Sequence, residues 1–145
     1  KNFNNFIIYG LDDYLVNSYI KKLLENQYGD INITKNSYVI ANYNKKEIEI
    51  KESQFHIEFN PTSSGLDKHS LLNLIQNYCQ HQMINVLIED VTTNVKTFVI
   101  NKVDDLNYYC QASLRRNMEK YSDVTRFILI SNNFLINFLG KKSRF

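Results

Sequence analysis

Two uninterrupted apolar runs, separated by a helical stretch, constrain the fold of this chain most strongly. One lies within Lys96–Val103 and the other is Phe127–Ile130. Runs without polar alternation are typical of strands that are buried on both faces of a parallel sheet. The segment between them, which begins at Asp105 and contains Arg115 and Arg116, predicts a helix. A strand, a helix and a second strand in this order indicate parallel strands joined by a crossover helix.

The first part of the chain continues this alternation. The predicted strands are Phe3–Tyr9, Ser37–Tyr43, Glu47–Lys51 and Phe55–Phe59, and the predicted helices are Tyr14–Asn26 and Leu66–Met83. The two middle strands alternate apolar and polar residues, so we expect them to pair around Asn44 and Lys45. The pattern predicts one α/β domain over residues 1–145, in which helices flank both faces of a parallel β-sheet.

The composition fits a folded domain without a metal site or a membrane segment. With 145 residues, one Pro and four Gly, the chain is long enough for one core and has few linker signals. Its formal charge of +2 gives no general affinity for polyanions. Cys79 and Cys110 are expected to be reduced and buried, and His56, His69 and His81 lack metal-ligand spacing. No apolar run reaches the roughly 18 residues of a transmembrane helix, so we expect an intracellular protein.

A helix with two adjacent arginines and a terminal Ser-Arg pair carry a resemblance to a known family. Residues 112–121 read Ala-Ser-Leu-Arg-Arg-Asn-Met-Glu-Lys-Tyr, and residues 143–145 read Ser-Arg-Phe. They resemble the Ala-Leu-Arg-Arg-Thr-Met-Glu-Lys-Tyr helix and the Ser-Arg-Cys motif of the small subunits of replication factor C, the clamp loader of the AAA+ superfamily. Asn117 stands in place of Thr, and Phe145 in place of Cys. Residues 45–50 and 55–65 resemble the branch that contains the subunit with the weakest ATP site.

This resemblance implies a fold, an assembly and a location. The fold would be an AAA+ RecA-like core, here without the lid and the collar that follow it in the family, so we expect an excised or truncated domain. The assembly would be a heteropentamer with other replication factor C subunits, which opens a ring-shaped sliding clamp and loads it on primer-template DNA. The location would be the nucleus, or a cytoplasmic replication site if the source is viral.

The loop after the first strand predicts a degenerate nucleotide site. A working P-loop reads G-x-x-x-x-G-K-[ST], because glycines let N–H groups wrap the phosphates while Lys and the hydroxyl serve phosphate and Mg²⁺. Gly10 is kept, but the second Gly, the Lys and the hydroxyl residue are replaced by Leu15, Val16 and Asn17. Asp12 and Asp13 add negative charge that repels a triphosphate. Ser18 remains a candidate displaced hydroxyl, and no bound cofactor is expected.

The second half of an ATPase site is also missing. A hydrolysing AAA+ subunit places Asp-Glu after the strand that contains residues 97–100, for Mg²⁺ and for activation of water. This chain has Asn101 and Lys102 there. Asp104 and Asp105 are read as the N-cap and a first-turn acid of the next helix rather than as a metal pair. Asn132 matches the polar sensor-one position of the family and fits a loop-capping role equally well.

By the same resemblance, the chain would act on its neighbour's ATP. Arg144, with Ser143, matches the arginine finger, and the guanidinium suits a γ-phosphate of the ATP and Mg²⁺ held by an adjacent subunit. The alternative is a solvated basic tail over residues 141–144. Arg115 and Arg116 fit an interface or coupling role, or an ion pair with Glu119.

DNA contact is implied at two helix starts, because the N-termini of clamp-loader helices face the phosphates of primer-template DNA. Ser64 and Lys68 are the candidates at the first start, where ordinary helix capping is the competing interpretation. The second start is residues 105–107. The resulting hypothesis is a non-hydrolysing clamp-loader subunit. The alternatives are a divergent P-loop NTPase that uses its own nucleotide and a non-catalytic interaction module.

Overall fold

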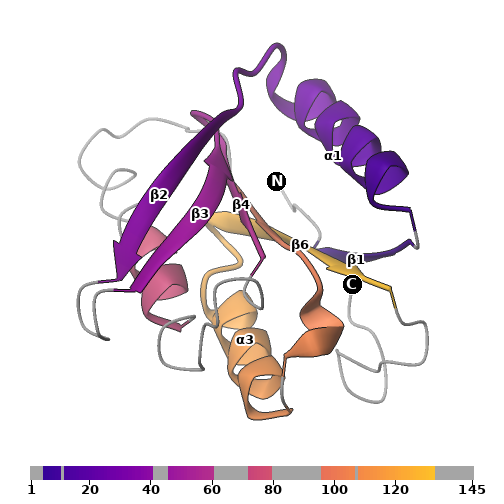
Figure 1. The fold of residues 1–145 in the computed structure, drawn as a ribbon. Coiled ribbons are helices and arrows are strands. Elements are labelled where there is room, and N and C mark those ends of the chain that lie inside the picture. The colour runs from indigo at the N-terminus through magenta and orange to yellow at the C-terminus, as the bar shows by residue number, and fades with distance from the viewer. Residues whose placement is uncertain are drawn as a thin grey trace.

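The computed structural model describes residues 5–10, 12–40, 46–60, 72–79, 96–106 and 108–132. These residues form a six-stranded sheet in the order β1-β6-β5-β4-β3-β2, with helices on its two faces (Figure 1). The strands are β1 (Phe6–Tyr9), β2 (Thr34–Ile40), β3 (Lys46–Glu52), β4 (His56–Phe59), β5 (Lys96–Ile100) and β6 (Thr125–Ser131). The helices are α1 (Asp13–Tyr28), a helical segment at 72–79, the 3₁₀ turn η1 (Val103–Asp105) and α3 (Tyr108–Lys120).

The predicted α/β fold is confirmed, with a sheet that is largely parallel but mixed. β1, β6, β5 and β4 are parallel to one another, whereas β3 is antiparallel to both β4 and β2. Ile40, at the end of β2, pairs with Lys46, at the start of β3, which confirms the predicted pairing around Asn44 and Lys45. A connection this short reverses the chain direction, so these two strands are necessarily antiparallel.

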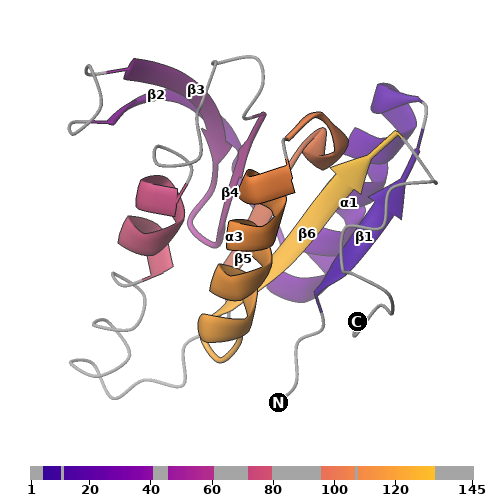
Figure 2. The same cartoon turned by 90° about the horizontal axis from the view of Figure 1, so that it is seen from below.

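One face of the sheet packs against α3 and the helical segment 72–79. Phe98 and Phe127, on the central strands, are fully buried on this face and stack with their ring centroids 5.6 Å apart. Leu114 and Met118 of α3 and Leu74 of the helical segment belong to the same cluster. In Figure 2, α3 lies in front of β6 while α1 lies behind the sheet. Phe98 and Phe127 were predicted as core residues, and their burial confirms this.

The opposite face packs against α1. Val16, Ile20 and Leu24 recur at helical spacing and contact Val99 and Ile128 of the central strands. Phe98 and Val99 point to opposite faces because side chains alternate along a strand. Both are 0% exposed, so the central strands are buried from both sides, as their apolar runs predicted.

The segment before α3 departs from its prediction. β5 ends at Ile100 rather than Val103, and α3 begins at Tyr108 rather than Asp105. Lys102 adopts a left-handed conformation with φ of 53°, and the 3₁₀ turn η1 follows. This turn buries Val103 in the same cluster as Leu114 and Met118 of α3. A longer strand or an earlier α-helix would place the Val103 side chain elsewhere.

Candidate functional site

A cavity of about 290 Å³ lies at the carboxyl ends of the parallel strands. Asp13 and Asn17 of α1, Asn101 after β5 and Asn132 after β6 contribute to its wall, which continues over residues of β3 and β4. In open α/β sheets, ligands bind at this edge of the sheet. The cavity therefore marks the position at which a nucleotide site is predicted.

The start of α1 is capped by a carboxylate of the chain itself. Asp12 Oδ1 accepts hydrogen bonds from the backbone N–H groups of Tyr14 at 2.9 Å and Leu15 at 3.4 Å. Asp13 adds a second acidic group in the first turn. Free N–H groups at a helix start attract phosphate, so a side-chain cap there removes donors and adds negative charge.

The position matched to the P-loop lysine is part of the core. Val16 is 8% exposed and packs with Ile20 and Ile128 between α1 and the sheet. A β-carbon on Gly10 would lie 2.5 Å from Val16 Cγ2, so the close approach of these two residues requires glycine. Gly10 N donates to Ser131 O at 3.1 Å, which ties the end of β1 to the end of β6.

The other predicted nucleotide-site residues are only partly brought together. Asn132 lines the cavity, and its backbone N–H donates to Asp104 Oδ1 at 3.3 Å. Asp104 lies in the turn η1 and bonds the end of β6, a position different from the expected N-cap of the long helix. Ser18 is half-buried on α1 and does not line the cavity, whereas Asn17 does.

Arg115 and Arg116 lie on α3, away from the cavity lining. Arg116 Nη2 donates to Ser113 Oγ at 3.0 Å, one turn earlier on the same helix. Arg115 is half-buried. The remaining predicted residues, Ser64, Lys68, Ser143 and Arg144, lie outside the described residues, so their roles remain predictions.

A charged row across the hairpin was not predicted from the sequence. Lys35 pairs with Lys51 across β2 and β3, and Lys51 pairs with Glu58 across β3 and β4. Glu58 is only 7% exposed, and its Oε1 accepts a hydrogen bond from Asn101 Nδ2 at 3.3 Å. The polar residues at alternate positions of the predicted strands were the available signal, but their alignment depends on the pairing register.

His56 lies beside Glu58 beneath α1 and is buried as a neutral ring. Its side chain is 0% exposed, and its Nδ1 shares a hydrogen bond with Ser53 Oγ. Nε2 has no hydrogen-bond partner among the described residues and lies 4.0 Å from Glu58 Oε2. Burial lowers the pKa of His56 to about 4. No group of three or more possible metal ligands occurs among the described residues.

A second polar cluster holds the C-terminal end of α1 against the sheet. The Tyr28 hydroxyl and Thr97 Oγ1 are 2.8 Å apart, and the Tyr28 ring stacks on Phe55. Arg126 donates to Thr97 and to Gln27. Burial raises the pKa of Tyr28 and lowers that of Arg126. These contacts fix the direction in which α1 crosses the sheet.

The fold and the position of the cavity define an α/β domain consistent with part of an AAA+ core. No protein-family model matches the chain. A protein of Acanthamoeba polyphaga mimivirus described as a replication factor C small subunit is 40% identical over 117 residues, which are 79% of this chain and 31% of that protein. Replication factor C subunit 5 of Schizosaccharomyces pombe is 29% identical over 136 residues, covering 90% and 37% of the two chains. Replication factor C subunit 3 of Homo sapiens is 28% identical over 138 residues, covering 91% and 38%.

The chain is therefore homologous to replication factor C small subunits over most of its length. It spans about a third of the length of these relatives, between 31% and 38%. In the part of the chain that the structure describes, no helix is long and apolar enough to cross a membrane.

Proposed function

We propose that this chain is a non-hydrolysing subunit of a DNA sliding-clamp loader. It supports clamp loading on primed DNA and supplies an arginine finger to the ATP site of the neighbouring subunit. The homology to replication factor C subunits supports the assignment to a clamp loader. Its partners are then the other subunits of a heteropentamer, a ring-shaped sliding clamp and primer-template DNA, in the nucleus or at a cytoplasmic viral replication site.

The single observation that carries the non-hydrolysing role is the Asp12 cap on α1. Its carboxylate accepts two N–H groups at the helix start, where a nucleotide-binding domain offers such groups to phosphate. Val16 supplies no charge at the position matched to the P-loop lysine, because its side chain is packed in the core. Both features make the binding of a magnesium nucleotide at this helix start unfavourable.

The end of β5 supports the same conclusion. Asn101 occupies the position of the metal-binding Asp, and its amide donates to Glu58. An amide that donates a hydrogen bond does not supply the negative charge that Mg²⁺ prefers. Asp104 accepts the N–H of Asn132 and so is already used in fastening η1 to β6. Asn101 and Lys102, the two residues that directly follow β5, thus supply no carboxylate to activate water.

The role in trans is proposed for Arg144 with Ser143. Its guanidinium would stabilise the charge that develops on the γ-phosphate of ATP held with Mg²⁺ by the neighbouring subunit. Arg115 and Arg116 are proposed to brace the interface or to couple DNA to that ATP site. Ser64 and Lys68 are the proposed DNA contacts at a helix start.

A divergent P-loop NTPase is the second candidate, because the cavity is present and four asparagine residues line it, Asn60 among them. Asn17, Asn101 and Asn132 offer hydrogen bonds to a nucleotide without charge. A third candidate is a non-catalytic interaction module. It differs from the proposal only in that Arg144 would not act on the ATP of the neighbouring subunit.

ATP hydrolysis by the purified chain separates the first two candidates. We expect no turnover above background with Mg²⁺ and ATP, for the wild type and for Asn132→Ala. Saturable turnover by the wild type that Asn132→Ala abolishes, while Asn77→Ala on the helical segment 72–79 retains it, would favour the divergent NTPase. In the assembled loader, Arg144→Ala is expected to lower the ATPase rate.

A further inference from the structure

We propose that a groove between α1 and the β2–β3 hairpin binds a small phosphate-bearing anion through Lys21, Lys35 and Lys51. The groove is called the lysine groove below and has a volume of about 290 Å³. It adjoins the cavity at the strand ends, because Asn17, Lys35, Lys51 and Glu58 line both. The inference concerns a different ligand-binding surface from the start of α1 and does not depend on the proposed clamp-loader role.

The charges that line the groove are unbalanced. Lys21 from α1, Lys35 from β2 and Lys51 from β3 face a single carboxylate, that of Glu58 on β4. The described lining thus carries two more positive than negative groups. A concave site lined by an excess of one charge concentrates ligands of the opposite charge.

The strand register brings two of these lysines together. Lys35 and Lys51 are direct cross-strand partners, so their side chains lie on the same face of the hairpin. Like charges at directly opposite positions destabilise a sheet. Among the described residues, no carboxylate lies within 4.0 Å of the Lys21, Lys35 or Lys51 ammonium groups. An anion between the strands would offset this repulsion.

Glu58 does not neutralise the lysines fully. It is the direct cross-strand partner of Lys51 only, and its Oε1 already accepts the Asn101 amide. Its burial on the sheet keeps it at the floor of the groove, whereas Lys35 is exposed at the mouth. Lys21 and Lys35 are left to share an external anion.

A phosphate group fits this arrangement better than a single carboxylate does. It carries up to two charges near neutral pH and several acceptor oxygens, which match several ammonium donors and the Asn17 amide. Ile20 and Leu24, which are almost fully buried, also line the groove, and its volume of about 290 Å³ suits a small ligand. The start of α1, capped by Asp12, is not needed for this contact.

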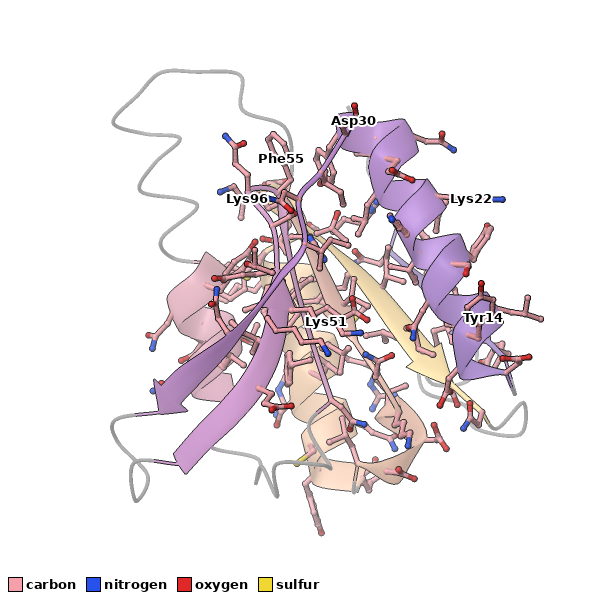
Figure 3. The ribbon with its side chains drawn as sticks, turned by 45° about the horizontal axis from the view of Figure 1, so that its top comes forward. Tyr14, Lys22, Asp30, Lys51, Phe55 and Lys96 are labelled. Carbon is pink, nitrogen blue, oxygen red and sulfur yellow. The ribbon has the colours of Figure 1, made fainter. Side chains whose placement is uncertain are left out.

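Pyrophosphate is the probe for the test, because it presents phosphate charge without a base or a sugar. We would measure its effect on thermal unfolding and its affinity by calorimetry at low salt, where charge contacts are least screened. The variant Lys35→Gln with Lys51→Gln removes two groove charges. The matched control, Lys22→Gln with Lys120→Gln, removes two exposed charges elsewhere. Figure 3 shows Lys51 between α1 and the hairpin, whereas Lys22 points away from the sheet.

The wild type and the control are expected to gain stability from pyrophosphate. The groove variant should bind pyrophosphate at least about tenfold more weakly. Without pyrophosphate, Lys35→Gln alone should raise the melting temperature slightly, because it removes the like-charge pair. A purely structural role of Lys35 would not combine a higher melting temperature with a loss of the pyrophosphate effect.

Three results would overturn the proposal. One is the absence of any pyrophosphate effect on the wild type at millimolar concentration. Another is an equal effect on the groove variant and on the control, which would indicate binding governed by net charge. The third is tighter binding of a short DNA oligonucleotide than of pyrophosphate, lost in the groove variant, which would assign the lysines to nucleic acid.

Discussion

Asp12 Oδ1 lies 2.9 Å from the backbone nitrogen of Tyr14, so a carboxylate of the chain holds the position at which a helix start would bind phosphate. The contact is local in sequence and forms with the helix itself. The Asp12 cap and the packing of Val16 in the core both stabilise the junction between β1 and α1. The proposed loss of hydrolysis in cis depends on this contact.

Removal of the cap should destabilise the domain. Asp12→Ala is expected to lower the free energy of unfolding by about 1 kcal/mol, because the N–H groups of the first turn lose their acceptor. Urea denaturation measures this directly. Asp30→Ala removes another exposed aspartate, after α1, and should change the free energy by less than about 0.5 kcal/mol. Equal effects of both variants would show that net charge, and not capping, is responsible.

The close approach of Gly10 and Val16 predicts coupling between them. Gly10→Ala places a β-carbon against Val16 Cγ2 and should cost about 1–3 kcal/mol. In the background of Val16→Ala, the same change should cost much less, because the clashing methyl group is gone. A double-mutant cycle by urea denaturation measures the coupling. Additive effects of the two changes would contradict the contact.

His56 predicts a loss of stability in weak acid. Its pKa is about 4 in the fold and 6.5 ordinarily, so the unfolded chain takes up the proton first as the pH falls. The contribution of neutral His56 to the free energy of unfolding is complete above pH 6.5 and is lost as the pH falls from 6.5 to 4. Between pH 7 and pH 5 the loss is about 2 kcal/mol.

Variants separate this group from the other histidines. His56→Gln should flatten the dependence of unfolding free energy on pH between 7 and 5, and His69→Gln, at a position outside the described residues, measures how much another histidine contributes. Urea denaturation of each variant at both pH values makes the comparison. An unchanged slope in His56→Gln would mean that other groups cause the acid sensitivity.

The two cysteines should be unreactive until the chain unfolds. Cys79 and Cys110 are both buried, which confirms the prediction, and burial raises the pKa of Cys79 to about 11. Because only the thiolate is a good nucleophile, a thiol reagent at pH 8 should modify neither cysteine in the native protein. Both should react in denaturant. Rapid modification of Cys79 without denaturant would contradict the packing of the helical segment against the sheet.

The central strands were predictable because their local pattern is unambiguous. Phe98 and Val99 lie in a run without polar alternation, and both are buried on opposite faces. The start of α3 was not predictable from its acidic residues, because Asp104 is used to bind the Asn132 N–H rather than to cap a long helix. The burial of Val103 determines that turn, and burial depends on tertiary packing.

The residues of the candidate site also differ in whether the sequence alone could identify them. The sequence alone predicts that Val16 and Asn101 replace residues of an ATPase site, once the patterns of such sites are considered. The row formed by Lys35, Lys51 and Glu58 is not visible, because it requires the register of two antiparallel pairings. A shift of one residue in either pairing would turn these side chains to the other face.

The ATPase rate of a reconstituted clamp loader, with wild-type subunit or with Arg144→Ala, would show whether this chain acts on the ATP of its neighbour. Primed DNA and the sliding clamp would be present, and Lys142→Ala would serve as the matched control for a basic tail. The account predicts a fall of about tenfold or more for Arg144→Ala, as loss of an arginine finger requires, and little change for Lys142→Ala. An unchanged rate in a fully assembled complex with Arg144→Ala, or equal losses in both variants, would contradict it.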